Sequence, residues 1–247
     1  MNKTALITGR AKGIGKAIAY ELANNGYNLA LFYNTSELLA QQLQVELTQK
    51  GVNCQIYKCD ISNEEEVRQM VYRATKHFGK IDVLVNNAGI ALNSLFHTKS
   101  VEEFKTTFNV NVIGTFLVSK YVGEDMFKNK QGKIINLSST NGINTYYPMC
   151  IDYDASKSAI NSLTHNLSMQ FAPYVIVNAV APGFIATESE LDGMDNEFIK
   201  LEEEKVMVKR AGQPQEVAKL VRFLASDDAN FINNQIIKID GGIYGDC

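Results

Sequence analysis

Thr8-Gly9-Arg10-Ala11-Lys12-Gly13-Ile14-Gly15 joins a short apolar run, residues 4–8, to a segment with apolar residues at helical spacing, residues 14–25. Glycines between a strand and a helix permit a tight turn and let the backbone approach a pyrophosphate held at the helix N-terminus. The spacing is Gly-x-x-x-Gly-x-Gly, not the commoner Gly-x-Gly-x-x-Gly. We therefore predict an α/β fold that binds a dinucleotide at this turn, although glycines there can also be purely structural.

The same alternation of short apolar runs and helical patterns continues along the 247 residues. Near-continuous apolar strands separated by helices indicate a parallel sheet covered on both faces. The chain contains no internal repeat and no low-complexity linker, so we predict one doubly wound domain over residues 1–247. Strands are expected at 29–33, 54–57, 81–85, 133–137, 174–180 and 235–239, and helices at 37–50, 63–78, from 101 and 109 onward, 153–171 and 214–225.

One stretch departs from this alternation. Over residues 184–210 the apolar pattern weakens and charges concentrate at 202–205. A solvated helix is one explanation. The other, which we adopt as a prediction, is a flap that covers a substrate.

Composition excludes several classes of function. A net charge of −3 gives no reason to expect nucleic acid or an anionic membrane as a partner. No apolar run approaches the ~20 residues of a membrane helix, and the N-terminus leaves no room for a signal peptide, so we expect a cytoplasmic protein. Four cysteines and three histidines lack metal-ligand spacing, so we predict no metal. Cys54 and Cys59 are expected in or beside a buried strand.

The end of the second strand predicts which dinucleotide is preferred. An acidic residue there would bind the ribose 2′-hydroxyl of NAD(H), whereas a nearby basic residue would accept the 2′-phosphate of NADP(H). This chain offers Tyr33 and Asn34 at that point and no carboxylate, while Arg10 and Lys12 add positive charge in the glycine turn. NADP(H) is favoured and NAD(H) remains possible.

Tyr153-Asp154-Ala155-Ser156-Lys157 places a phenol and an ammonium one helical turn apart, on the same face. A neighbouring ammonium favours the phenolate and lowers the tyrosine pKa, which suits a group that donates and accepts protons near neutral pH. Taken alone, such a pair is also common on surface helices.

The chain resembles the short-chain dehydrogenase/reductase family from end to end. The match comprises the Thr8 to Gly15 turn, Asp60 in Cys-Asp-Ile-Ser, Asn86-Asn87-Ala88-Gly89, Asn111 in Asn-Val-Ile-Gly, Ser139 in Ser-Ser-Thr-Asn-Gly, Tyr153 with Lys157, Pro182-Gly183 with Thr187, and Asp240-Gly241-Gly242. The resemblance implies a Rossmann-type sheet of seven parallel strands in the order 3-2-1-4-5-6-7. It also implies that Asp60 and Ile61 contact the adenine, and that Asn87, Ala88 and Gly89 line the cofactor path. The remaining residues expected at the cofactor are Thr8, Gly9, Arg10, Lys12, Gly13, Ile14, Gly15, Tyr33, Asn34, Tyr153, Lys157, Pro182, Gly183, Ile185 and Thr187.

The same resemblance assigns the chemical roles. Tyr153 would donate the proton in carbonyl reduction, and Lys157 would lower the pKa of that tyrosine and hold the nicotinamide ribose. Ser139 would stabilise the carbonyl oxygen by a hydrogen bond. Asn111 would hold a water that connects Lys157 to solvent. The residues expected around the substrate are Ser139, Asn141, Met149, Cys150 and Tyr153. Met149 and Cys150 belong to a segment, 146–152, that is bulkier than usual for the family and walls the pocket in relatives.

Substrate and assembly are less constrained. The chain is most similar to bacterial 3-oxoacyl-[acyl-carrier-protein] reductases, which implies a ketone carried by an acidic protein and a place in fatty acid biosynthesis. Lys128, Lys130 and Lys133 are a candidate docking group near the site, or simply a solvated turn. A reductase of another ketone or secondary alcohol (a sugar, polyol or steroid) is the alternative, and a dinucleotide sensor without turnover is a third. Relatives imply a homotetramer.

Overall fold

The computed structural model describes residues 2–9, 11–144, 146–192 and 194–243. Within them, seven parallel strands form one sheet in the order β3-β2-β1-β4-β5-β6-β7, which confirms the predicted architecture. The strands are β1 Thr4–Thr8, β2 Asn28–Tyr33, β3 Cys54–Lys58, β4 Val83–Asn86, β5 Gly132–Leu137, β6 Val175–Pro182 and β7 Ile236–Ile239.

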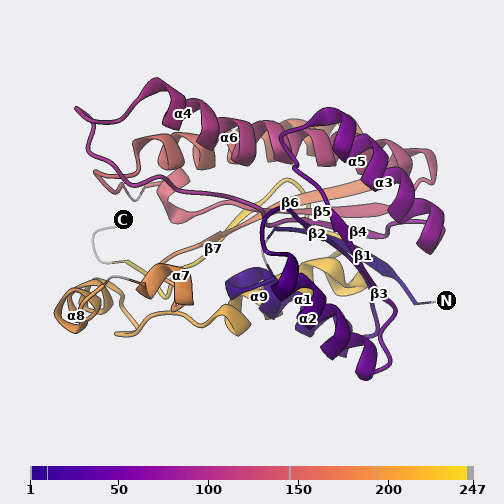
Figure 1. Cartoon of the computed structure of the whole chain (residues 1–247), viewed down its shortest axis with the longest axis horizontal. Helices are drawn as coiled ribbons and strands as arrows, with labels where there is room; N and C mark the ends of the chain where they lie inside the picture. Colours follow the sequence, from indigo (N-terminus) through magenta and orange to yellow (C-terminus); the bar gives the residue numbers. More distant parts are fainter. Residues whose placement is uncertain (1, 10, 145, 193, 244–247) are drawn as a thin grey trace.

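Helices cover both faces of the sheet (Figure 1). One face carries α1 (Gly13–Asn24), α2 (Glu37–Gln49) and α9 (Pro214–Ala225), and the other carries α3 (Glu64–Phe78), α4 (Val101–Phe108), α5 (Thr115–Lys128) and α6 (Ile151–Phe171). Two apolar clusters result. The first joins Ile18 of α1 to Val221 of α9, and the second joins Val67 of α3 to Val118 of α5. Since β1 and β5 are buried along their whole length, near-continuous apolar strands are what the two covered faces require.

Two helical boundaries differ from the sequence-based expectation in ways that matter for the site. Helix α6 begins at Ile151, two residues earlier than predicted, so Tyr153 lies in its first turn. Asn109–Gly114 forms a π-helix, not the start of an α-helix. The wider turn buries both Asn111 and Gly114, and an added Cβ on Gly114 would lie only 2.6 Å from the Ile61 side chain. Such π segments are frequent at functional sites.

Residues 184–210 contain two helices, α7 (Glu188–Leu191) and α8 (Asn196–Lys205). Helix α8 buries none of its described side chains, as expected of a solvated helix. The segment is nevertheless tied to the body of the fold, because Ile185 bridges to Gly212 and Val206 bridges to Ile243. Within the described ranges, no helix has the length and apolar character needed to cross a membrane.

Cys54 and Cys59 are buried on and directly after β3, where the sequence predicted them. Burial raises the pKa of each thiol to about 12, so both remain protonated and behave as small apolar side chains.

Candidate active site

The residues singled out from the sequence gather at the carboxyl ends of the strands. Thr8 ends β1, Asn86 ends β4, Leu137 ends β5 and Pro182 ends β6, and these four strands are neighbours in the sheet. In open α/β sheets, ligands bind at this edge.

The glycine turn is fixed to the end of β4. The Thr8 hydroxyl accepts hydrogen bonds from the backbone N–H groups of Asn87 (3.2 Å) and Ala88 (3.1 Å), and the Asn87 amide donates to the Thr8 carbonyl (2.9 Å). Gly9 has a φ of 116°, and a Cβ there would lie 2.6 Å from the Asn87 amide nitrogen. Only glycine fits both the backbone angle and the space. Arg10, the next predicted cofactor residue, lies outside the described residues.

Helix α1 begins directly after this turn. Its N-cap is Lys12, whose side chain has no oxygen to accept a hydrogen bond from the first N–H groups of the helix. Those groups are therefore available to an anion, which is what a pyrophosphate requires. Gly13, also at positive φ, faces Thr187 across the site, with Thr187 carbon atoms 3.5 Å from the position of an added Cβ.

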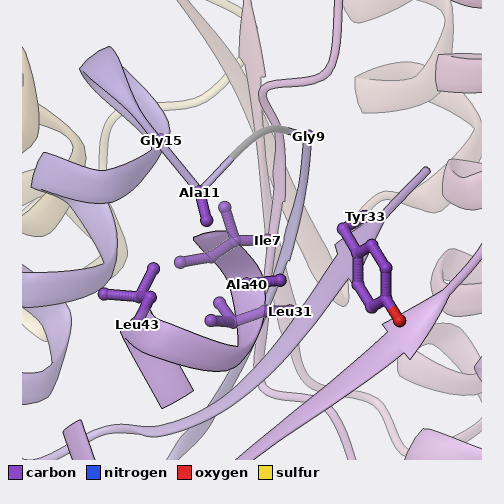
Figure 2. A pocket seen from close by; sticks show the side chains of 8 residues that line it. All are labelled: Ile7, Gly9, Ala11, Gly15, Leu31, Tyr33, Ala40 and Leu43. Atoms are coloured by element: carbon purple, nitrogen blue, oxygen red, sulfur yellow. The ribbon is translucent and has the colours of Figure 1, made fainter. Parts of the chain in front are cut away.

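A small crevice lies between the glycine turn and the end of β2 (Figure 2). Ile7, Ala11, Leu31, Ala40 and Leu43 gather on one side of it, while the Tyr33 ring extends away from them. Gly9, Gly15 and Tyr33 were predicted at the cofactor and all line it, whereas Asn34 is exposed beside it. The described lining contains no carboxylate, in agreement with the sequence of the β2 end.

The predicted adenine contacts follow β3. The Asp60 carboxylate accepts hydrogen bonds from the backbone N–H (3.0 Å) and the hydroxyl (2.7 Å) of Ser62, so it shapes its own turn. Ile61 is buried and packs on Gly114 of the π-helix.

Tyr153 and Lys157 share one face of α6, as their spacing predicts. The Lys157 ammonium lies 5.4 Å from the centre of the Tyr153 ring and donates to the Leu137 carbonyl (2.6 Å) at the end of β5. Burial lowers the pKa of Lys157 to about 8. A Cβ on Gly89 would lie 3.6 Å from this ammonium, which therefore borders the predicted cofactor path.

The pKa of the Tyr153 phenol is shifted in the opposite direction to the one expected from a neighbouring Lys157. Burial raises the pKa of Tyr153, and the hydrogen bond with the Ser139 hydroxyl only partly opposes that rise. Because the Lys157 ammonium is turned to the Leu137 carbonyl, desolvation outweighs the attraction that the sequence spacing suggested. The tyrosine is thus held in its protonated form at neutral pH.

Ser139 is held by a neighbour that was predicted only as pocket lining. Its Oγ accepts from the Asn141 backbone N–H (3.2 Å), and the Asn141 side-chain amide donates to Asp154 (2.7 Å). Asp154 is 8% exposed and was not predicted as a site residue, although it lies inside the Tyr153–Lys157 stretch. Ser138 points elsewhere and its hydroxyl lies 3.3 Å from the Lys157 carbonyl, so the choice of Ser139 over Ser138 agrees with the geometry.

Asn111 links the cofactor loop to α6. Its side-chain oxygen accepts from the Ile90 N–H (2.8 Å), and its amide donates to the Ile90 carbonyl and the Ser156 hydroxyl, both at 2.9 Å. Both amide hydrogens are used in these bonds, so the side chain acts first as a structural link between two elements of the site.

The end of β6 completes this edge of the sheet. Gly183 follows Pro182 and packs on Asp240, since an added Cβ would lie 2.6 Å from the Asp240 Cβ. Ile185 is buried, and the Thr187 hydroxyl accepts from the Glu190 N–H (3.1 Å) at the start of α7. The Glu190 carboxylate also raises the pKa of Tyr153, although less than burial does.

The predicted substrate wall contacts a segment that sequence reasoning missed. The Met149 carbonyl accepts from the Ser94 N–H (3.0 Å), and the Cys150 thiol donates to the Asn93 side-chain oxygen (3.0 Å). Burial raises the pKa of Cys150 to about 11, so the thiol is not nucleophilic at neutral pH. Nothing in the local sequence pattern of residues 93 and 94 marks them as site residues.

The predicted position of one lysine group is wrong. Lys128 ends α5 and Lys133 is the second residue of β5, so Lys128, Lys130 and Lys133 lie at the amino end of that strand, away from Leu137 and Lys157. Lys133 is also buried and donates to the Ser226 carbonyl. In a parallel sheet, each connection from a helix into the next strand lies at the edge opposite the carboxyl ends of the strands, and residues 128–133 form such a connection.

Comparisons with known proteins agree with this geometry. The family described as "Enoyl-(Acyl carrier protein) reductase" matches residues 9–244. The 3-oxoacyl-[acyl-carrier-protein] reductase FabG of Staphylococcus epidermidis is 36% identical, covering 99% of this chain and 100% of the relative. Glucose 1-dehydrogenase 2 of Bacillus subtilis is 35% identical over 98% of this chain and 94% of its own. The solved structure of ElxO with NADP bound superposes with a TM-score of 0.90 at 35% identity, covering 98% of each chain. With a family match over nearly its whole length, this chain belongs to the short-chain dehydrogenase/reductase family of oxidoreductases.

Proposed function

We propose that this protein is an NADP(H)-dependent oxidoreductase that interconverts a ketone and a secondary alcohol, and that 3-oxoacyl thioesters are its substrates. One observation carries the proposal. The Tyr153 phenol, the Ser139 hydroxyl and the Lys157 ammonium converge at the carboxyl edge of the sheet, next to the glycine-lined path that fits a dinucleotide.

Each of these groups has a role in carbonyl reduction. The bound nicotinamide would supply the hydride. Tyr153 gives its proton to the carbonyl oxygen, and as a phenol it holds that proton at neutral pH until the substrate arrives. Ser139 donates a hydrogen bond to the same oxygen as negative charge develops on it. Lys157 contributes a positive charge below its pKa of about 8 and binds the ribose.

The form of Tyr153 that burial favours in the free protein is the one that carbonyl reduction uses. Oxidation of an alcohol requires a phenolate as base, and burial disfavours that form of Tyr153. Reduction requires the neutral phenol, which the structure stabilises. Both amide hydrogens of Asn111 are already used in hydrogen bonds, so any part that this residue has in returning a proton to the site would depend on its other atoms.

The preference for NADP(H) is supported by the crevice at the end of β2. Its described lining lacks the carboxylate that would bind a ribose 2′-hydroxyl and repel a 2′-phosphate. Lys12 supplies positive charge nearby at the N-cap of α1. The solved relative ElxO holds NADP, which supports the same choice.

A second candidate substrate class has its own support. The wall near Tyr153 presents polar groups, among them Asn93 and Asn141. A sugar dehydrogenase is nearly as similar to this chain as the acyl-carrier-protein reductase, at 35% against 36% identity. A small polar ketone or a sugar is therefore the alternative. The lysine group at the far edge of the sheet gives no support to carrier-protein docking at the site.

Assembly, location and the flap belong to the same proposal. We propose a cytoplasmic homotetramer. Its assembly, though not its location, is supported by apolar side chains that remain partly exposed near α5 and at the start of α6: Ile113, Phe116 and Ile151. Residues 184–210 would cover the substrate, since Thr187 at the start of α7 faces Gly13 of the glycine turn. Light scattering of the purified protein measures the first of these directly.

A substrate screen followed by NADPH absorbance tests the proposal. The panel should contain acetoacetyl thioesters on coenzyme A and on acyl carrier protein, small diketones, and sugars with NADP⁺. We expect NADPH oxidation, fastest with an acetoacetyl thioester. Quenching of NADPH fluorescence without oxidation on any ketone would overturn the proposed activity, and turnover only with sugars would select the alternative.

A further inference from the structure

A buried ion pair lies next to the proposed proton donor. The Lys99 ammonium and the Asp152 carboxylate are 3.0 Å apart, with side chains 4% and 0% exposed. Asp152 immediately precedes Tyr153 in the first turn of α6. The other carboxylate oxygen accepts a hydrogen bond from the buried Thr107 hydroxyl of α4 (2.6 Å). Three elements therefore meet at this one carboxylate.

The pair joins the site to a segment that apolar packing cannot hold. Most of residues 93–98 are exposed, and Phe96 retains 73% of its surface. Polar contacts hold the segment instead. Lys99 also donates to the Leu92 carbonyl, so one ammonium ties both ends of residues 92–99 to Asp152.

The same segment supplies the substrate wall. Between its two tied ends, the Ser94 N–H reaches the Met149 carbonyl and the Asn93 side chain receives the Cys150 thiol hydrogen, each at 3.0 Å. Met149 and Cys150 were predicted at the substrate, and Cys150 is the N-cap of α6. The ion pair is thus the fixed end of a chain of contacts that runs along one side of the site to Tyr153.

The energetics favour a positional role over a purely stabilising one. Burial alone would raise the pKa of Asp152, but hydrogen bonds from Thr107 and Lys99 hold it below its ordinary value, so the carboxylate is ionised at neutral pH. Two buried charges cost desolvation that their attraction barely repays, and apolar residues of similar size often stabilise a fold as well. What they provide is fixed geometry, because one carboxylate oxygen accepts a hydrogen bond from Thr107 while the other lies 3.0 Å from the Lys99 ammonium.

We propose that the Lys99–Asp152 ion pair is a positioning device that holds residues 92–99 against the first turn of α6, and so fixes the substrate wall beside Tyr153. The expected change in kinetics rests on the proposed carbonyl reduction, whereas the expected change in the mobility of residues 92–99 does not. Neither residue touches the reacting atoms. Their effect passes through Asn93, Ser94 and the backbone of α6.

Four variants test it: Lys99→Met, Thr107→Val, the double variant Lys99→Met/Asp152→Leu, and the control Lys105→Met, which breaks the exposed α4 ion pair Lys105–Glu102. Hydrogen–deuterium exchange of residues 92–99 and 149–153 is the primary measurement. Thermal unfolding, NADPH affinity, kcat and KM follow. The control should match the parent in every measurement.

Lys99→Met leaves a buried carboxylate unpaired, so Tm should fall by roughly 6–20 °C. Exchange of residues 92–99 should rise at least ~10-fold, and kcat/KM for the ketone should fall roughly 10–100-fold, with most of the loss in KM and NADPH affinity within about twofold of the parent. The double variant should recover most of the Tm and keep the exchange and KM defects. Thr107→Val should change each quantity in the same direction by less.

Parental exchange and parental KM in the double variant would overturn the proposal, because the pair would then only fill the core. Unchanged exchange in Thr107→Val and Lys99→Met would overturn it as well. If the parent itself reduces no ketone, the proposed function fails, while the exchange measurement still decides whether the pair holds the segment.

Discussion

Gly142→Ala should lower the activity by displacing α6, although the added methyl group touches no reacting group. Gly142 ends the short 3₁₀ helix Thr140–Gly142 after β5 and packs directly on α6. An added Cβ would lie 2.6 Å from the Lys157 carbonyl carbon, 2.8 Å from its oxygen and 2.8 Å from the Ser158 nitrogen. These are backbone atoms of a helix, so no side-chain rotation relieves the contact, and the two elements must separate until the closest approach is about 3.4 Å.

The magnitude follows from what that separation displaces. Overpacking of this kind costs roughly 1–3 kcal/mol of unfolding free energy. The Gly142 carbonyl would also move from the Ser158 hydroxyl (3.1 Å) and the Asn161 amide (2.9 Å). Lys157 would shift relative to Leu137 by nearly 1 Å, and a misplacement of that size can lower kcat about 100-fold.

The assay compares Gly142→Ala with Gly132→Ala. The second variant is equally crowded, with an added Cβ 2.5 Å from the Met126 side chain, but it lies at the amino end of β5. Urea unfolding should show a loss in both variants, whereas NADPH oxidation should fall only in Gly142→Ala. A parental kcat in Gly142→Ala, or equal kinetic losses in the two variants, would refute the reasoning.

Three further outcomes are expected. Burial lowers the pKa of Lys157 from 10.5 to about 8, so between these pH values the unfolded chain binds more protons than the native protein. The unfolding free energy of the parent, relative to that of Lys157→Met, should therefore rise by roughly 3 kcal/mol as the pH increases across this window. Urea unfolding from about pH 7.5 to 10.5 measures this rise. Lys12→Ala should weaken NADPH binding roughly fivefold in fluorescence titrations and leave NADH nearly unaffected, and equal effects would contradict a 2′-phosphate contact. Asn141→Val removes the side-chain amide that donates to Asp154 (2.7 Å) and accepts from the Ser139 hydroxyl (3.4 Å), so kcat should fall about tenfold with NADPH affinity unchanged. A loss confined to NADPH affinity would contradict this.

The fold was predictable because its signals are local. The Thr8 to Gly15 turn and the alternation of apolar runs indicated a parallel sheet, and most strand ends lie within one or two residues of their predicted positions. The start of α6 was missed because the predicted boundary followed the Tyr153–Lys157 spacing. The π-helix at 109–114 was not predicted, because the sequence there has no pattern that separates it from an α-helix.

The site was predictable where a residue type is demanded by chemistry, and less so where tertiary contacts decide. Tyr153, Lys157 and Ser139 meet as expected. The partners that hold the wall, Lys99 and Asp152, come from distant segments with no spacing to connect them. The upward shift of the Tyr153 pKa could not be predicted from the sequence either, because one-turn spacing says nothing about burial.

The measurement that tests the central claim most directly is the kinetics of Tyr153→Phe. The change removes the phenolic oxygen and keeps the ring on α6, so NADPH affinity and thermal stability should stay close to those of the parent. Turnover of the best ketone from the substrate screen should fall by about 10²–10⁴-fold, because the proton donor is gone. Parental turnover in Tyr153→Phe would contradict the assignment of this residue as the proton donor.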